Sequence, residues 1–427
     1  MLGWRLGLER MRRLCSLLGM PQNRFASIHV VGTNGKTSVA RMTAALLEAH
    51  GVSAGAYVSP HIRSWRERIL IGGEPISEAA FTSALERVEQ GAQVADRSAG
   101  DEGPVTQFEL LTAAAFVAFA EARLDYAVVE AGLGGRLDAT NVIPSKLSVL
   151  TSVGLDHTEW LGETLEEIAA EKLAVLRDQT TLITGRMPHE VEPIVEREVE
   201  RRHAKRPSRW RVQVAPEPSG LDPRSLPGYQ RENSRLAWVA TKAALGRPDD
   251  DAIPEALEHA LVGLTIPGRA ELLPGDPPTV LDAAHNPDGA RALAELLPDL
   301  VPPREVRRGL RKRSEPREIV CCLAVLEEKD AAGIVEALAP AVSHFVCAEI
   351  PPAAIEGSGR PSGRSHPAME LASLCGEAGV VAEAIADPLE AWRRTQKLAR
   401  ERDGVALAAG SHYLLSSIWT ERHAANS

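Results

Sequence analysis

The feature that most constrains this chain is a glycine-rich turn between a predicted strand and a predicted helix. The apolar run 27–31 leads into Gly-Thr-Asn-Gly, and an amphipathic helical pattern begins at Lys36. Glycines let backbone N–H groups converge on phosphate oxygens, and a helix N-terminus adds partial positive charge. Lys36 would add a full charge, and Thr37 or Ser38 a hydroxyl for Mg²⁺. The segment predicts a nucleotide-phosphate site in shortened form, because Val30 stands where the standard spacing has glycine.

Strand-like and helical patterns alternate along the first half of the chain. Predicted strands at 27–31, 55–58, 126–130 and 147–151 are separated by helical patterns at 37–49, 78–89, 109–122 and 165–176. Such alternation indicates a mainly parallel, doubly wound α/β sheet. After a stretch rich in Pro and Gly at 265–278, a second set of strands is predicted at 279–282, 318–326, 344–348 and 405–409.

We therefore expect an α/β protein of two domains. Residues 1–265 would form a P-loop-containing, doubly wound domain, and residues 266–427 a smaller Rossmann-like α/β domain. Residues 201–228 and 351–367 are expected to be irregular, and the basic segment 301–317 to be a solvated loop.

Composition limits the classes of partner. The formal net charge is −10, so no basic field exists to attract nucleic acid or an anionic membrane, and neither is expected as a partner. Charged residues interrupt the first twenty positions, which argues against a signal peptide. The five cysteines form no CxxC pair, and buried free thiols are expected. We expect a cytoplasmic monomer with small-molecule substrates.

Three further residues with chemical potential lie near predicted strand ends or on a helix. Glu130 ends an apolar strand before a glycine-rich turn, and His157 follows the next strand. Ligands bind at the carboxyl ends of strands in open α/β sheets, so both residues would lie near the phosphate site. Lys172 sits among apolar neighbours on a helix, where burial would lower its pKa. The alternatives are a salt-bridge carboxylate, a structural histidine and a lysine with its amine in solvent.

Together these segments resemble the folylpolyglutamate synthase/dihydrofolate synthase family of the Mur ligase superfamily. The resemblance runs nearly end to end in ordered blocks. These blocks are GWRLGLERM from residue 3, HVVGTNGKTS from 29, SPHIRSWRERILIGG from 59, TQFELLTAAAF from 106, VVEAGLGGRLDATNV from 128, TSVGLDHTEWLG from 151, EKLAVL from 171, PGRAEL from 267, LDAAHNP from 281 and GSHYL from 410. The resemblance implies an ATP-dependent ligase that adds L-glutamate to a folate or to dihydropteroate through an acyl phosphate.

The resemblance also implies roles for individual residues. ATP would be bound by Gly32, Thr33, Asn34, Gly35, Lys36, Thr37, Ser38, Asn233 at the adenine, Arg269 at the γ-phosphate and Asp282 at the ribose. Two Mg²⁺ ions would be held by Thr37 or Ser38, Glu130, His157 and a carbamylated Lys172. The pterin substrate would face Ser59, Pro60, His61 and Asp138, and glutamate would face His285 and Ser411. The residues implied in catalysis are Lys36, Lys172, His157, Arg269 and His285.

Two departures from the family pattern leave alternatives open. Gly-Lys-Thr-Ser at 35–38 is nearer to the peptidoglycan Mur ligases, so either hydroxyl could be the metal ligand. Ser234 replaces the usual alanine after Asn233, which makes the adenine contact less secure. A second hypothesis is a peptidoglycan-type Mur ligase, although only about thirty residues precede the loop, too few for a separate UDP-binding domain. A third hypothesis is a nucleotide-binding regulatory protein without ligase activity.

Overall fold

The structure is a computed structural model that describes residues 7–97, 102–205, 226, 228–247, 255–301, 303–308, 311–356 and 363–424. The chain divides into two compact units. The N-terminal unit comprises Met1–Ser225 and Gln230–Leu264, and the C-terminal unit comprises Leu226–Tyr229 and Thr265–Ser427. The short piece 226–229 thus groups with the C-terminal unit although the chain on either side of it does not.

The N-terminal unit is built on a seven-stranded sheet in the order β4-β3-β2-β5-β1-β6-β7. Its strands are β1 (Ala26–Val31), β2 (Ala54–Tyr57), β3 (Ile69–Ile71), β4 (Glu74–Pro75), β5 (Tyr126–Glu130), β6 (Leu147–Leu150) and β7 (Thr181–Thr184). β3 is antiparallel to both of its neighbours, β2 and β4, and the other neighbouring strands pair in parallel. The mainly parallel sheet expected from the sequence is confirmed.

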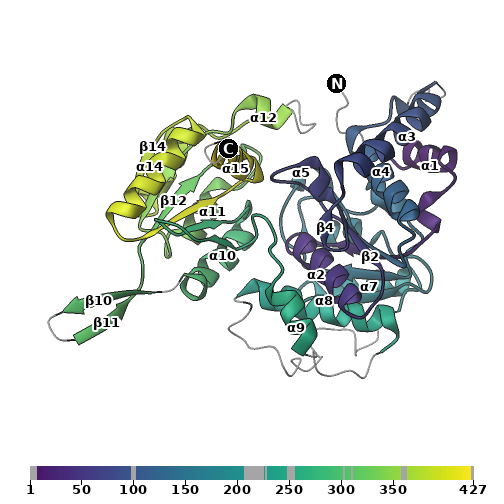
Figure 1. The fold of residues 1–427 in the computed structure, drawn as a ribbon, viewed down its shortest axis with the longest axis horizontal. Helices are drawn as coiled ribbons and strands as arrows, with labels where there is room; N and C mark the ends of the chain where they lie inside the picture. The colour runs from purple at the N-terminus through teal and green to yellow at the C-terminus, as the bar shows by residue number, and fades with distance from the viewer. Residues whose placement is uncertain are drawn as a thin grey trace. The chain divides into compact units, whose positions relative to one another are not determined.

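Helices cover both faces of this sheet (Figure 1). They are α1 (Glu9–Leu17), α2 (Lys36–Ala49), α3 (Glu78–Asp96), α4 (Gln107–Glu121), α5 (Thr158–Leu161), α6 (Leu165–Leu173), α7 (Glu192–Arg201), α8 (Tyr229–Leu245) and α9 (Glu255–Val262). Neighbouring side chains of β5 point to opposite faces. Val129 therefore packs in a core with α1, α3 and α4, whereas Val128 packs in a core with α2 and α8.

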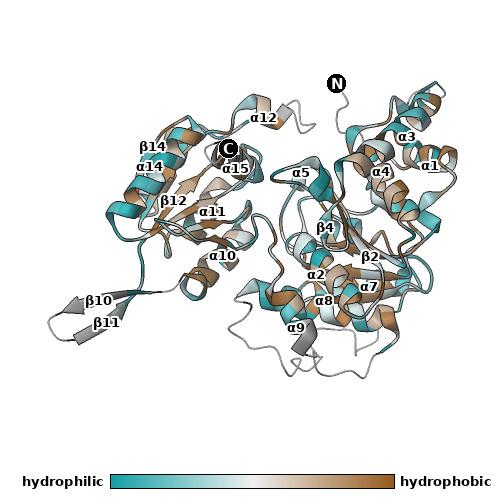
Figure 2. Cartoon of the chain, in the orientation of Figure 1, coloured by the Kyte–Doolittle hydropathy of each residue, from teal (hydrophilic) through white to brown (hydrophobic). Residues whose placement is uncertain are grey.

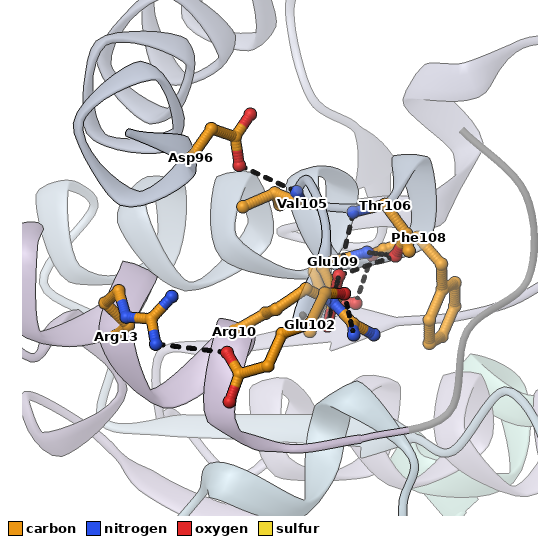
Figure 3. A network of polar contacts seen from close by, with 9 residues as sticks. Arg10, Arg13, Asp96, Glu102, Val105, Thr106, Phe108 and Glu109 are labelled. Carbon is orange, nitrogen blue, oxygen red and sulfur yellow. Dashed lines mark hydrogen bonds and ion pairs between the residues drawn. The ribbon is translucent and has the colours of Figure 1, made fainter. Parts of the chain in front are cut away.

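A buried ion pair ties α1 to the start of α4 (Figure 3). Arg10 donates from Nε to Glu109 Oε2 at 3.1 Å, and the two side chains are 6% and 3% exposed. Glu109 also completes a capping box, because its carboxylate accepts from the N–H and hydroxyl of Thr106 at 2.8 Å each. Arg10 Nη1 donates to the Glu102 carbonyl at 3.0 Å. This network, the Arg10 cluster, fixes where α4 begins.

The C-terminal unit has a six-stranded sheet in the order β14-β13-β12-β15-β9-β8. The strands are β8 (Glu271–Leu273), β9 (Thr279–Leu281), β12 (Ile319–Leu323), β13 (His344–Cys347), β14 (Val381–Ala384) and β15 (Val405–Ala409). The helices are α10 (Pro287–Leu300), α11 (Ala331–Leu338), α12 (Pro352–Glu356), α13 (Ala368–Glu377), α14 (Pro388–Glu401) and α15 (His412–Ala424). Only β8 is antiparallel to its neighbour among the strands of this sheet that the structure describes. Figure 2 shows the apolar β12 in brown beside the mostly hydrophilic α14.

The prediction for the basic segment 301–317 is wrong. Its residues form an antiparallel hairpin of β10 (Arg304–Arg308) and β11 (Arg311–Glu315) instead of a loop. The few apolar residues in this segment hid the strand pattern. In the expected irregular stretch 351–367, α12 is helical, and most of the stretch 201–228 lies outside the described residues.

The structure bears on the cysteines and on the apolarity of the helices. All five cysteines are buried and free, as predicted. Within the ranges that the structure describes, no helix combines the length and the apolarity needed to cross a membrane.

Candidate active site

The phosphate loop joins β1 to α2, and two of its positions require glycine. Gly32 has φ +151°, and a Cβ there would lie 1.9 Å from the Thr151 hydroxyl oxygen. Gly35 has φ +84°, and a Cβ there would lie 2.6 Å from Oδ1 of Asn233. Any larger side chain would strain the backbone and push the loop away from its supports.

The segment that follows β6 holds the loop from one side. Asn34 N–H donates to Ser152 Oγ at 2.9 Å, and Thr151 Oγ1 donates to the Asn34 carbonyl at 2.6 Å. Thr33 Oγ1 accepts from Gly154 N–H at 3.0 Å. The loop that carries the predicted phosphate ligands and the loop that leads to His157 are therefore one hydrogen-bonded assembly.

Two lysines converge on the carbonyl oxygen of Gly32. Lys36 Nζ and Lys172 Nζ each donate to it at 3.0 Å, and Lys36 Nζ also donates to the Thr33 carbonyl at 2.9 Å. Lys172 is only 3% exposed. Burial and the nearby charge of Lys36 lower the pKa of Lys172 to about 7, and Asp156 opposes this effect. At neutral pH a large fraction of Lys172 is therefore an uncharged, nucleophilic amine.

Thr37 and Glu130 form a second cluster beside the loop. The Thr37 hydroxyl lies 3.0 Å from both carboxylate oxygens of Glu130, which is 1% exposed. Glu130 Oε2 also accepts from Ser59 N–H at 3.0 Å. A hydroxyl and a buried carboxylate make an oxygen-rich pair that suits Mg²⁺. The Ser38 hydroxyl is buried and has no hydrogen-bond partner among the described residues, so Thr37 is the one brought to the carboxylate.

His157 lies between β6 and α6 in an uncommon backbone conformation. Its φ is +53°, and its N–H bonds to the carboxylate of the preceding Asp156 at 3.0 Å. Asp156 is 9% exposed and acts electrostatically on Lys172. A non-glycine residue with positive φ is uncommon and marks a position worth functional attention. We did not predict Asp156 as a site residue, although its place directly before His157 is visible in the sequence.

The turn predicted to face the pterin substrate, Ser59–His61, follows the end of β2 at Tyr57. His61 packs against Trp65 with its ring tilted by 44° and 4.2 Å between ring centroids, and its Nδ1 accepts from Arg68 Nε at 3.0 Å. Burial and the charge of Arg68 lower the pKa of His61 to about 4, so this ring is neutral. The pKa of buried Tyr57 is raised to about 12, mainly by burial; the charge of Arg68, which holds His61, opposes this effect and that of Asp138 adds to it.

Asp138 closes the glycine-rich loop that follows β5. It is 4% exposed, and its Oδ2 accepts from Leu133 N–H at 2.8 Å. Burial raises the pKa of Asp138, while hydrogen bonds from Thr140 and from the backbone lower it. The same loop packs on Phe108, whose ring would be 2.5 Å from a Cβ at Gly132. Sequence reasoning missed Phe108 and Thr140 as parts of this site.

Asn233 belongs to α8 and lies against the phosphate loop at Gly35. Its amide also donates to Gln230 Oε1 at 3.3 Å. Its predicted contact with adenine stays a prediction, and what the structure adds is its position beside the loop.

In the C-terminal unit, Asp282 directly follows β9 and is 3% exposed. Its oxygens accept from the N–H groups of Ala270 and Ala284 at 2.8 Å each, and Tyr229 donates its hydroxyl to Oδ2. Burial raises the pKa of Asp282, whereas the Tyr229 hydrogen bond and the charge of Arg269 lower it. Asp282 thus fixes the turn that carries Arg269. The predicted ribose contact of Asp282 and phosphate contact of Arg269 remain predictions.

His285 and Ser411 lie at the same sheet edge, because β9 and β15 are parallel neighbours. Gly410 N–H donates to the Ala284 carbonyl at 2.9 Å, which links the two loops directly. His285 Nδ1 is 2.8 Å from the Ala283 carbonyl, and Ser411 is 2% exposed. Their place at one sheet edge is compatible with the prediction that His285 and Ser411 face the substrate glutamate, which stays a prediction.

Comparisons with known proteins agree with this arrangement. A sequence profile described as the Mur ligase middle domain matches residues 30–191, and one described as the Mur ligase glutamate ligase domain matches residues 268–412. The dihydrofolate synthase/folylpolyglutamate synthase of Mycobacterium tuberculosis is 36% identical over 369 residues, which cover 79% of this chain and 73% of that protein.

Solved structures are similar over nearly the whole chain. A Mycobacterium tuberculosis folylpolyglutamate synthase complexed with ADP has a TM-score of 0.83 and 32% identity, covering 98% of this chain and 95% of that one. A bifunctional folylpolyglutamate synthase/dihydrofolate synthase with Mn, AMPPNP and L-glutamate bound has a TM-score of 0.79 and 28% identity, covering 99% and 95%. The chain belongs to the dihydrofolate synthase/folylpolyglutamate synthase family of Mur ligases.

Proposed function

We propose that this chain is an ATP-dependent ligase that adds L-glutamate both to dihydropteroate and to folates. The observation that carries the proposal is the convergence of Lys36 and Lys172 on the Gly32 carbonyl within the phosphate loop. The charge of Lys36 suits a reaction in which negative charge develops on a transferred phosphoryl group, and the lowered pKa of Lys172 suits its modification to a carbamate. Relatives named for both activities support this assignment over a peptidoglycan substrate or a regulatory role.

The proposed reaction has two steps. A carboxylate is a poor acceptor for an amine, so a carboxylate oxygen of the pterin substrate first attacks the γ-phosphorus of ATP. ADP leaves, and an acyl phosphate is formed. The glutamate amine then attacks the acyl carbon, loses a proton, and inorganic phosphate departs. Positioning of three anionic reactants, with neutralisation by Lys36, supplies most of the acceleration.

Thr37 and Glu130 are the proposed holders of Mg²⁺. Bound there, the ion would neutralise charge on the phosphates. The assignment favours Thr37 over Ser38, because the Thr37 hydroxyl meets both Glu130 oxygens at 3.0 Å. His157 is proposed as a further ligand from the neighbouring loop.

Lys172 is proposed to carry a carbamate. The neutral amine attacks CO₂, an N–C bond forms, and a proton is released, which turns a cation into an oxygen ligand. A pKa of about 7 keeps the amine available for this step at neutral pH. The resulting negative charge would also relieve the repulsion between Lys172 and Lys36.

A side-by-side assay tests the function. Phosphate release and glutamylated product would be measured with dihydropteroate and with tetrahydrofolate, each with and without glutamate. We expect phosphate release only when ATP, glutamate and one pterin substrate are all present. If only one of the two pterin substrates were glutamylated, the bifunctional assignment would be overturned. If ATP were hydrolysed at the same rate without any pterin substrate, the ligase assignment would be overturned.

The carbamate is tested separately. Activity of protein stripped of CO₂ should recover with bicarbonate, and Lys172→Ala should be partly restored by acetate or propionate. Crystals of active protein, supplied with bicarbonate, Mg²⁺ and nucleotide, would overturn the carbamate if they showed a bare Lys172 amine.

A further inference from the structure

A buried hydrogen-bond chain links the strand before the phosphate loop to Asp138. His29 lies in the middle of β1 and is 1% exposed. Its Nε2 is 2.9 Å from Thr140 Oγ1, and Thr140 in turn donates its hydroxyl to Asp138 Oδ1. The Thr140 N–H donates to the same carboxylate oxygen at 3.0 Å. Sequence reasoning assigned no chemistry to His29 or Thr140.

The direction of the chain follows from the chemistry of its members. The Asp138 carboxylate only accepts, so the Thr140 hydroxyl proton points toward it. Thr140 Oγ1 must then accept from His29, which places the imidazole proton on Nε2. Burial and the charge of Arg177 lower the pKa of His29 to about 3, so the ring stays neutral and keeps this single orientation.

Arg177 fastens the same turn from another side. Its guanidinium donates to the Asn141 carbonyl at 2.7 Å and to the Ile143 carbonyl at 3.2 Å. Asp138, held by Thr140, accepts from Leu133 N–H through its other oxygen. The glycine-rich loop at 132–138 is therefore shaped by contacts that reach back to β1.

We infer that His29 and Thr140 are positioning residues for the pterin substrate. They hold the Asp138 carboxylate and the 132–138 loop in the conformation that binds the substrate. The inference rests on the proposed function, because it takes Asp138 to face the pterin. Neither residue is proposed to touch substrate, so their removal should weaken pterin binding and leave nucleotide binding unchanged.

Thr140→Val and Thr140→Ser form the test pair. Valine matches threonine in shape but lacks the hydroxyl, whereas serine keeps it. Hydrogen bonds to charged groups predict a loss of roughly tenfold or more in affinity for dihydropteroate with Thr140→Val. Thr140→Ser should stay within about threefold of the wild type, and the Kd of ADP should change less than twofold in both. His29→Phe should resemble Thr140→Val, and His29→Gln, which keeps an N–H donor, should be milder.

Three measurements decide the inference. Calorimetry gives the Kd of dihydropteroate and of ADP, steady-state kinetics separates KM from kcat, and hydrogen exchange reports protection of the Leu133 amide. Unchanged dihydropteroate affinity in Thr140→Val, or equal losses for dihydropteroate and ADP, would overturn it. Hydrogen exchange needs no folate, so it separates the two proposals. If wild-type protein bound no pterin while Thr140→Val still exposed Leu133, the proposed function would fail and the positioning contact would stand.

Discussion

Two groups of charged side chains in the N-terminal unit are handled in opposite ways. In the Arg10 cluster, a guanidinium meets a carboxylate at 3.1 Å, and both side chains are at most 6% exposed. At the phosphate loop, two lysine amines donate to one backbone carbonyl, and the pKa of Lys172 falls to about 7. The first arrangement neutralises its charge within the protein. The second disfavours the charge of Lys172 and keeps Lys36 at the place where an anion is expected to bind.

The contrast separates stability from activity. A buried pair that is complete contributes to the native structure mainly because loss of one partner leaves the other uncompensated. Burying a lysine beside another lysine disfavours its charged form and destabilises the ligand-free protein, a cost that is common at functional sites. Changes in the two groups should therefore move stability and turnover in different combinations.

Lys36→Ala should have the largest effect on activity. We expect ligation to fall by about a thousandfold or more, since Lys36 acts on charge that develops in a site shielded from water. The free energy of unfolding should change little. Lys146→Ala, an exposed lysine in the same unit, is the control and should keep its turnover. Near-wild-type turnover with unchanged ATP affinity in Lys36→Ala would contradict the phosphate-loop assignment.

Arg10→Met should have the largest effect on stability. The uncompensated Glu109 should lower the free energy of unfolding by about 3–5 kcal/mol, measured by urea denaturation. Arg12→Met on the same helix is the control, because Arg12 and its partner Glu9 are 57% and 64% exposed. Its loss should stay below about 1 kcal/mol. Equal losses in the free energy of unfolding for Arg10→Met and Arg12→Met would show that burial gives the Arg10 cluster no special role in stability.

Lys172→Met should separate the effect on stability from the effect on ligase activity most clearly. It should abolish ligation and yet raise the free energy of unfolding of the ligand-free protein by about 1–4 kcal/mol, because an apolar side chain replaces a buried amine whose charged form is disfavoured. Thermal unfolding without ligands measures the second effect. A decrease in stability would mean that the ammonium group is a structural element like Arg10.

His29→Gln should have the smallest effect, and it should depend on pH. The pKa of His29 is about 3 in the folded protein and about 6.5 when unfolded. Between these values the unfolded state binds more protons, so stability is lost as pH falls through this window. By pH 5 the loss from His29 should be about 2 kcal/mol, and His29→Gln should remove it. Urea midpoints at pH 7 and pH 5 measure it, with exposed His189→Gln as the control. A variant that loses as much as the wild type would argue against a neutral His29.

The sequence alone was sufficient to predict the elements that have a regular pattern of apolar residues. Apolar runs and glycine turns predicted the parallel strands, the phosphate loop and the place of Glu130 at a strand end. The hairpin at 304–315 escaped because its strands are charged instead of apolar, and strand pairing depends on the partner as well as on local pattern.

Contacts between distant segments were beyond the sequence. A single amino-acid sequence does not show that His29 contacts Thr140 or that Arg10 contacts Glu109, because these pairs lie 111 and 99 positions apart. A histidine inside an apolar strand was a visible signal for the first pair. The contact between the Thr37 hydroxyl and Glu130 also needed coordinates, since both hydroxyls follow Lys36 and only their rotation about the helix distinguishes them.

The Arg10 cluster has a consequence for protein engineering. Beside it, the carboxylate of Asp96, the last residue of α3, accepts from Val105 N–H at 2.8 Å, while Arg10 and Arg13 hold Glu102. Side chains of α1 and α3 therefore anchor the segment 102–105 that leads into α4. A fluorescent reporter on α1 should spare Arg10 and Arg13, and position 12, where the side chain is 57% exposed, is a suitable place to attach it.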